Sequence, residues 1–446
     1  MPAAPFTGRR LHFVGIGGAG MSGLAWVACS LGAEVSGSDR ADSSYSQRLR
    51  AHGIELTIGH DAANMPDGAE VVVSTAIPET NPELVAALSS GSRVLHRGEL
   101  LGEVSRLKRS IAVSGTHGKT TTSGMAAHVL AACGREPAFL IGGELRSQGT
   151  NAAWGEGEWI VVEADESDRS FLRLARDVAV ITNVELDHHA TYRSLSELRA
   201  AFEEFAAPAG AVIAGPGAGR QGAVEYGIDS GDLRAENLSL RPLGSSFEVE
   251  GHVVELNVPG EHNVLNALAA LAACREAGVD VDEAAPALAG YTGAGRRFED
   301  RGRTASGARV FDDYAHHPTE VRATLEAAHT LGAERVVACF QPHLYSRTRE
   351  LAREFGRALA LADLVVVCDV YPARERVEDF PGVSGLMVAR EAAHAGRGRR
   401  VWWVPALDEA AARLGTELGE GDALLTLGAG DVDRVAAALV EANGGA

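Results

Sequence analysis

Short apolar runs alternate along the whole chain with longer segments in which apolar residues recur at helical spacing. The first example is the run LHFVGIG at 11–17, followed by a helical pattern at 20–32 and a second apolar run at 33–39. A strand, a helix and a strand in this order form a βαβ unit. The pattern therefore predicts an α/β protein with mainly parallel sheets.

This alternation restarts twice, at the strand pattern RSIAVSG (109–115) and again after GYTGAGRRFED (290–300). The central part closes with a strongly helical segment at 262–278. Glycine- and proline-containing stretches at 206–218 and 290–296 are predicted to be connecting loops. The predicted domains are residues 1–106, 107–292 and 293–446.

Length and composition indicate a multidomain globular protein. The 446 residues exceed what one core supports, and 46% of them are apolar. We expect a cytoplasmic protein without membrane insertion, because no apolar run approaches the ~20 residues of a spanning helix and the N-terminus lacks a signal-peptide pattern. The net charge of −19 argues against nucleic acid as a partner. Five scattered cysteines predict neither a disulfide framework nor a zinc site.

A first glycine-rich loop has the spacing GxGxxG at Gly15, Gly17 and Gly20, between a predicted strand and a predicted helix. Asp39 ends the next strand about 20 residues later, as in dinucleotide-binding units. Such a loop places a diphosphate on the helix N-terminus, where free amides attract it. The spacing does not identify the ligand, so NAD, FAD and a purely structural turn all remain open for this segment.

A second loop, SGTHGKTTTSG at 114–124, resembles a Walker A loop but has Val113 where that motif requires its first glycine. Gly115 and Gly118 allow close approach of the backbone to phosphate. Lys119 is able to reach terminal phosphate oxygens, and Thr120 is able to ligate Mg²⁺. The loop follows an apolar strand pattern and precedes a helix, which favours a phosphate site.

Two later strand patterns end in residues suited to metal binding. Glu163 ends the run before ADESD, and His188 follows NVELD. Carboxyl ends of parallel strands meet at one edge of a sheet, so we expect His188 beside Glu163 and the phosphate loop. The competing interpretation is an exposed acid at a strand end and a structural histidine.

Nine motifs in one order resemble the Mur ligases of peptidoglycan synthesis, and the resemblance covers essentially the whole chain. The motifs are GIGGAGMSG, GTHGKTTT, EADESD, TNVELDH, GEHNVLNALAA, GAGRRFE, DDYAHHPTEV, FQPHLYSRT and TLGAGD. The resemblance implies a Rossmann-like UDP-binding domain, a central P-loop-type ATPase domain and a Rossmann-like C-terminal domain. It implies the alanine-adding branch, with ATP and Mg²⁺ as cofactors and UDP-N-acetylmuramate and L-alanine as substrates. We expect a monomer or a weak homodimer.

The resemblance also implies roles for individual residues. The catalytic set is Lys119, Glu163, His188, Arg297 and Asp313. ATP contacts are assigned to Gly115, Thr116, His117, Gly118, Lys119, Thr120, Thr121, His262, Asn263, Asn266, Arg297 and Asp313. UDP contacts are assigned to Gly17, Gly18, Ala19, Gly20, Met21, Ser22 and Asp39. The amino-acid site is assigned to Tyr314, His316, His343 and Arg347, and the metal ligands are Thr120, Glu163 and His188.

The chain departs from the family pattern in three ways. Ala190 stands where an acid usually lies two places after the DH histidine, and Leu344 replaces an arginine, which leaves Arg347 as the main cation for the substrate carboxylate. The carbamylated lysine of several sister ligases has no counterpart, because the chain contains only Lys108 and Lys119.

The implied chemistry is attack of a carboxylate on the γ-phosphate of ATP to give an acyl phosphate, followed by attack of the L-alanine amine. His188 and His316 are both candidates to accept the amine proton. Three alternatives remain: a ligase of the same family that adds a tripeptide, an NAD-dependent dehydrogenase built on the first loop, and a noncatalytic UDP-sugar sensor.

Overall fold

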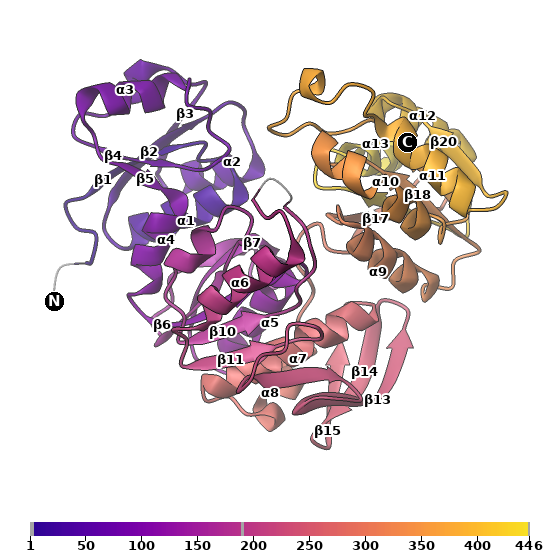
Figure 1. Ribbon diagram of the computed structural model, residues 1–446, viewed down its shortest axis with the longest axis horizontal. Helices are drawn as coiled ribbons and strands as arrows, with labels where there is room; N and C mark the ends of the chain where they lie inside the picture. Colours follow the sequence, from indigo (N-terminus) through magenta and orange to yellow (C-terminus); the bar gives the residue numbers. More distant parts are fainter. Residues whose placement is uncertain (1–3, 189–190, 445–446) are drawn as a thin grey trace. The chain divides into compact units, whose positions relative to one another are not determined.

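The computed structural model describes residues 4–188 and 191–444 (Figure 1). The chain divides into two compact units, Met1–Arg234 with Asn266–Leu288, and Ala235–Leu265 with Ala289–Ala446. Ala190, one of the departures from the family pattern, lies outside the described residues. No helix in the described ranges is long and apolar enough to cross a membrane.

The first unit begins with a parallel sheet of strand order β3-β2-β1-β4-β5. This order places β1 in the centre, with β2 and β3 on one side and β4 and β5 on the other. The strand order therefore reverses beside β1, as in doubly wound nucleotide-binding folds. Both faces are covered, because Val72 packs with α1 and α4 whereas the neighbouring Val71 packs against Ala87 of α3. The elements are β1 (Arg10–Val14), α1 (Ala19–Ser30), β2 (Glu34–Asp39), α2 (Ser44–Ala51), β3 (Glu55–Ile58), β4 (Glu70–Val73), α3 (Pro82–Ser90), β5 (Val94–His96) and α4 (Arg97–Ser105).

A buried polar cluster surrounds Glu83 of α3, whose side chain is fully buried. Its carboxylate accepts hydrogen bonds from Ser38 Oγ at 2.5 Å and Asn64 Nδ2 at 2.6 Å. His12 Nε2 and His60 Nδ1 lie 3.6 and 3.5 Å away. Burial raises the pKa of Glu83, but the hydrogen bonds outweigh burial and hold the pKa at about 2.

Glu83→Gln is therefore expected to lower the free energy of unfolding at pH 7 by roughly 3 kcal/mol, the value of a pKa depression of this size. Because the pKa of Glu83 is lower in the folded than in the unfolded protein, its charge stabilises the fold at pH values above 4.5. This stabilisation is lost as the pH falls towards 2. Urea unfolding from pH 7 to pH 3 should show the gap to wild type closing below pH 4.5, with exposed Glu79→Gln as the control. A gap independent of pH would contradict this account.

The first unit also contains the central sheet, whose strands run in the order β12-β11-β10-β6-β9-β7-β8. All neighbouring pairs recorded here are parallel except β7 with β8. The elements are β6 (Arg109–Ser114), α5 (Lys119–Ala132), β7 (Ala138–Leu145), β8 (Thr150–Ala153), β9 (Trp159–Glu163), β10 (Val178–Ile181), α6 (Leu195–Ala206), β11 (Ala211–Ala214), β12 (Val224–Ile228) and α8 (Val281–Leu288).

The prediction that 206–218 is only a connecting loop was wrong. Residues 211–214 form β11, which pairs with β10 in the parallel sheet. The glycines and prolines on either side concealed a strand of four residues, which is too short for a periodic pattern to show.

Helix α1 packs against the central sheet within the first unit. A Cβ atom on Gly23 would lie 3.0 Å from the Cβ of Ala152, and Asn151 Nδ2 donates to the carbonyl of Ala19 at 2.6 Å. Arg97 at the start of α4 reaches Asp165 Oδ2 with its Nη2 at 2.8 Å. The first glycine-rich loop is thus held beside the segment that follows β9.

The second unit contains an antiparallel group, β13-β14-β15, and a sheet of order β16-β17-β21-β18-β19-β20 in which only β16 is antiparallel to its neighbour. Ala338 of β18 packs with α9 to α11, and the adjacent Cys339 packs with α12 and α13. The elements are β13 (Leu233–Arg241), β14 (Gly244–Val249), β15 (His252–Leu256), β16 (Glu299–Arg303), β17 (Arg309–Asp313), α9 (Pro318–His329), β18 (Arg335–Phe340), α10 (Tyr345–Leu359), β19 (Leu364–Val367), α11 (Gly385–Ala395), β20 (Arg400–Trp403), α12 (Leu407–Glu417), β21 (Asp422–Leu427) and α13 (Asp433–Gly444). Helix α7 (Glu261–Glu276) begins in this unit and ends in the first.

Candidate active site

The second glycine-rich loop joins β6 to α5 and leaves the start of α5 open. Gly115 and Gly118 have φ values of 130° and 83°, which disfavour other residues. A Cβ on Gly118 would lie 2.3 Å from Asn266 Oδ1, and one on Gly115 would lie 2.0 Å from Thr182 Oγ1. In the described chain no side chain caps α5, so its first amides are free to bind an anion.

Lys119 lies in the first turn of α5 with its ammonium turned back into the loop. Nζ donates to the carbonyls of Gly115 at 2.6 Å and Thr116 at 3.1 Å, and it pairs with Glu166 Oε2 at 2.9 Å. Burial lowers the pKa of Lys119, but Glu166 and Asp165 outweigh burial and raise it. The ammonium therefore stays charged at neutral pH.

Thr120 and Glu163 come together as predicted from the loop and the strand end. Thr120 Oγ1 donates to Glu163 Oε1 at 3.1 Å, and the amide of Gly142 donates to Glu163 Oε2 at 2.7 Å. A hydroxyl and a carboxylate are the hard oxygen ligands that Mg²⁺ prefers. These two side chains therefore fit a magnesium ion beside the phosphate loop.

His188 does not lie as the strand pattern predicted. Strand β10 ends at Ile181, and β6 separates it from β9, so His188 is presented by the loop that follows. Its Nε2 contacts Glu166 Oε1 at 3.1 Å, and its φ of 55° is unusual for a residue other than glycine. The nearer partner of its ring is thus Glu166, three residues beyond the predicted neighbour Glu163, and Asp187 Oδ2 lies 3.8 Å from the same nitrogen.

Sequence reasoning missed two acidic residues of the EADESD motif. Glu166 is fully buried and contacts both Lys119 and His188. Asp165 pairs with Arg97, and although burial raises the pKa of Asp165, Arg97, Lys119 and His188 together lower it. The available signal was the number of acids in one short motif directly after a buried strand.

The remaining predicted ATP residues of the first unit lie in the second glycine-rich loop, in α5 or in contact with α5. Thr116 Oγ1 donates to the carbonyl of Glu185 at 2.8 Å, and the amide of His117 donates to Asn183 Oδ1 at 2.9 Å. Thr121 is buried in α5. Asn266 Oδ1 accepts from Thr122 Oγ1 at 3.2 Å, which ties α7 to α5.

His262 and Asn263 lie in the first turn of α7 and belong to the second unit. Burial lowers the pKa of His262 to about 4, so its ring is neutral at pH 7. Asn263 Nδ2 donates to the carbonyl of Pro259 at 2.7 Å. With Asn266 one turn later, the helix presents polar side chains at its N-terminal end.

The first glycine-rich loop is closed on one side by Asp39. The amide of Gly17 donates to Asp39 Oδ2 at 2.8 Å, and a Cβ on Gly17 would lie 3.0 Å from that oxygen. Gly18 precedes Ala19 at the start of α1 without a side-chain cap among the described residues. Gly20, Met21 and Ser22 follow in the first turn, the last two with buried side chains.

Arg297 and Asp313 are neighbours in the second unit. Asp313 accepts hydrogen bonds from the amides of Phe298 and Ala315, both at 2.8 Å. Burial raises the pKa of Asp313 to about 6, although Arg297 and these hydrogen bonds lower it. Arg297 lies 5.3 Å from the ring centre of Tyr314.

The predicted amino-acid residues also form one cluster. The ring of His316 lies 5.3 Å from that of Tyr314 and 5.8 Å from that of His343. Arg347 Nη1 lies 3.2 Å from His343 Nδ1. Tyr371, which sequence reasoning missed, stacks on His343 with ring centres 5.7 Å apart.

Leu344, the departure beside this cluster, starts α10 with a φ of 70°. Such a backbone conformation is costly for leucine and is typical of functional sites.

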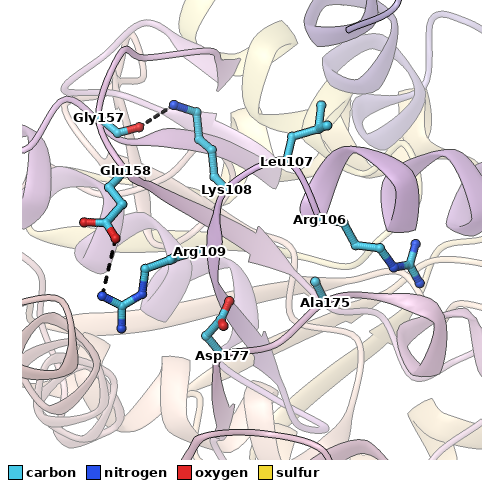
Figure 2. Close-up of a pocket in the computed structure, with 8 residues that line it drawn as sticks. All are labelled: Arg106, Leu107, Lys108, Arg109, Gly157, Glu158, Ala175 and Asp177. Carbon is cyan, nitrogen blue, oxygen red and sulfur yellow. Dashed lines mark hydrogen bonds and ion pairs between the residues drawn. The ribbon is translucent and has the colours of Figure 1, made fainter.

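A pocket of about 590 Å³ lies at the other end of β6, away from the phosphate loop (Figure 2). There Lys108 Nζ donates to the carbonyls of Gly155, at 2.9 Å, and Gly157. Lys108 is thus bound at the start of the strand and is no counterpart of a lysine that bridges metals. The pocket is lined by Arg106, Leu107, Lys108, Arg109, Gly157, Glu158, Ala175 and Asp177.

Comparison with known proteins matches three family models along the chain. They are the Mur ligase family catalytic domain at residues 10–109, the Mur ligase middle domain at 113–274 and the Mur ligase glutamate ligase domain at 296–430.

Two curated relatives are both named UDP-N-acetylmuramate–L-alanine ligase. The protein of Streptomyces coelicolor is 47% identical over 97% of each chain. That of Rubrobacter xylanophilus is 45% identical over 97% of this chain and 99% of its own.

Two solved structures resemble the whole chain. A UDP-N-acetylmuramate-alanine ligase of Thermotoga maritima has a TM-score of 0.84 at 32% identity, covering 97% of this chain and 98% of its own. A murein peptide ligase of Psychrobacter arcticus has a TM-score of 0.74 at 26% identity, covering 98% of this chain and 99% of its own.

Proposed function

This chain belongs to the Mur ligase family, and from that premise we propose that it is an ATP-dependent amide ligase joining L-alanine to the lactoyl carboxylate of UDP-N-acetylmuramate. The structural observation that carries the proposal is the phosphate loop, in which Lys119 and the Thr120–Glu163 pair meet at the start of α5. A dehydrogenase built on the first glycine-rich loop would have no use for this arrangement. A noncatalytic sensor of UDP-sugars would not need Lys119, Thr120 and Glu163 in this arrangement either.

The first step activates a carboxylate, which is a poor acyl donor at neutral pH. Its oxygen attacks the γ-phosphorus of ATP, the bond to the β-phosphate oxygen breaks, and an acyl phosphate and ADP form. The barrier is repulsion between anions, which Lys119, the free amides of α5 and Arg297 lower by neutralising charge. Mg²⁺ held by Thr120 and Glu163, with a second ion at His188, would supply further positive charge.

In the second step the alanine amine attacks the acyl carbon and expels phosphate. Arg347 is proposed to bind the carboxylate of alanine, since a guanidinium grips a carboxylate through two parallel hydrogen bonds. Of the two candidates for the proton that the amine loses, His188 and His316, only His316 keeps that role when His188 binds the second ion. Asp39 and the loop at Gly17 to Ser22 are proposed to hold UDP.

A ligase that adds a tripeptide to the same sugar nucleotide is the second candidate, because a murein peptide ligase shares the fold. Curated relatives at 44–48% identity carry the alanine name, which favours alanine.

The deciding experiment measures phosphate release from ATP with and without UDP-N-acetylmuramate and L-alanine. Release that requires both substrates, with an alanyl product of the expected mass, supports the proposal. Release with the tripeptide and none with alanine would replace it by the second candidate.

Glu163→Ala and His188→Ala are each expected to raise the Mg²⁺ concentration needed for half-maximal activity, because each removes a proposed direct ligand. The check is a Mg²⁺ titration at saturating substrates. Asp168→Asn, in the segment that follows β9, is the control. Unchanged midpoints for both alanine variants would show that neither residue binds the ion.

A further inference from the structure

Glu166 is a fully buried carboxylate beside the phosphate loop. Its side chain is 1% exposed, and its backbone carbonyl accepts hydrogen bonds from Tyr192 Oη at 2.8 Å and from the amide of Arg169 at 3.1 Å. These two hydrogen bonds hold the backbone from which the Glu166 side chain extends. A buried charge is retained only where it is paired and hydrogen-bonded.

One of its partners is Lys119, whose hydrogen-bonding capacity is used up within the protein. An ammonium has three donors. In this structure they are directed at the carbonyls of Gly115 and Thr116 and at Glu166 Oε1, which lies 3.1 Å from Nζ, and Glu166 Oε2 lies within ion-pair distance at 2.9 Å. Lys119 therefore has to release a partner before it is able to bind a phosphate oxygen.

The other partner is His188, whose Nε2 lies 3.1 Å from Glu166 Oε1. An ionised carboxylate only accepts hydrogen bonds, so the ring nitrogen facing it carries the proton. That contact orients the ring, so that Nδ1 is the nitrogen left to bind a metal ion, as in other carboxylate–histidine–metal arrangements.

We propose that Glu166 is a positioning residue of the ATP site: it holds Lys119 in a resting position, yields it to the terminal phosphate of ATP, and keeps the His188 ring oriented. The inference rests on the proposed role of Lys119 in ATP binding. Because Glu166 and the phosphate compete for one ammonium, the carboxylate weakens nucleotide binding. Because it also orients His188, the same carboxylate raises the rate of the chemical step.

Glu166→Gln separates these two effects, since the amide keeps the shape and removes the charge. The dissociation constant of the nonhydrolysable analogue AMP-PNP with Mg²⁺ is expected to fall about tenfold, because no anion then competes for Lys119. The kcat of the full reaction is expected to fall at least about tenfold, a size usual for a misplaced catalytic group. A purely structural residue would weaken both properties.

Asp168→Asn is the matched control. Asp168 belongs to the same loop and is nearly buried, but its recorded charged neighbours are His96 at 3.6 Å and Arg97 at 3.9 Å. Its AMP-PNP affinity should stay within about twofold of wild type. AMP-PNP affinity that is unchanged or weaker in Glu166→Gln would overturn the counter-ion role, and an equal gain in Asp168→Asn would show a general charge effect instead.

A second readout does not depend on turnover. In protein labelled with ¹⁵N-histidine, the His188 signals, assigned by comparison with His188→Ala, are expected to show that the neutral ring carries its proton on Nε2 rather than on Nδ1. The opposite tautomer would overturn the orienting role. A different result would contradict the proposed function itself: wild-type enzyme that binds AMP-PNP but forms no alanyl product.

Discussion

Lys119→Ala is expected to lower turnover by about a hundredfold to a thousandfold while leaving the fold intact. Negative charge accumulates on the phosphate oxygens as the acyl phosphate forms, and a positioned cation that meets this charge contributes about 2.7 to 4 kcal/mol. Lys119 is one of only two lysines in the chain, and it is the one in the phosphate loop. The measurement is the initial rate of phosphate release with both substrates present.

Lys108 provides the control, because it lies at the opposite end of β6 and binds backbone carbonyls rather than the loop. Lys108→Ala should keep its rate within a few-fold of wild type. Circular dichroism of both variants checks that the protein remains folded. A Lys119→Ala enzyme that keeps more than about a tenth of the wild-type rate would disprove the assignment of this lysine.

L-alanine is expected to be the preferred amino acid, with L-serine and glycine measurably poorer and no reaction of D-alanine, L-lysine or the tripeptide. Arg347 would fix the carboxylate of any α-amino acid, so the choice among them depends on the pocket around the side chain. A pocket of methyl size excludes larger groups by collision. It disfavours glycine only through the lost methyl contact, about 10- to 200-fold.

Competition among these amines, with the product mixture read by mass spectrometry, tests the ranking in one experiment. Arg347→Lys is the companion variant, because it keeps the charge and loses the paired geometry; it should raise the KM for alanine without changing the KM for ATP. A tripeptide product, or equal rates for glycine and alanine, would refute the ranking and leave the ligase proposal in place.

The sequence was sufficient to predict those structural features that depend on residues close together in the chain. The βαβ pattern, the two glycine-rich loops and the strand before Glu163 are all local, and the structure confirms each of them. Gly115 and Gly118 illustrate the reason: their backbone conformations exclude most other residues, so the glycines themselves mark the loop. The pairing of Thr120 with Glu163 was also predictable, because Glu163 ends β9 and Thr120 starts the helix that follows the neighbouring parallel strand β6.

Contacts between distant residues were decided only by the tertiary structure. Glu166 meets Lys119 and His188 across 47 and 22 residues of chain, and Arg97 reaches Asp165 across 68. Hydrophobic periodicity shows which face of an element is buried, but it does not show which polar side chain from another element will meet it. The six residues between β10 and His188 likewise have no repeating pattern, so their path depends on packing alone. The sequence by itself therefore determined the two loops and the strands and helices that flank them, whereas the fold decided that a buried Glu166 joins the loop lysine to the histidine.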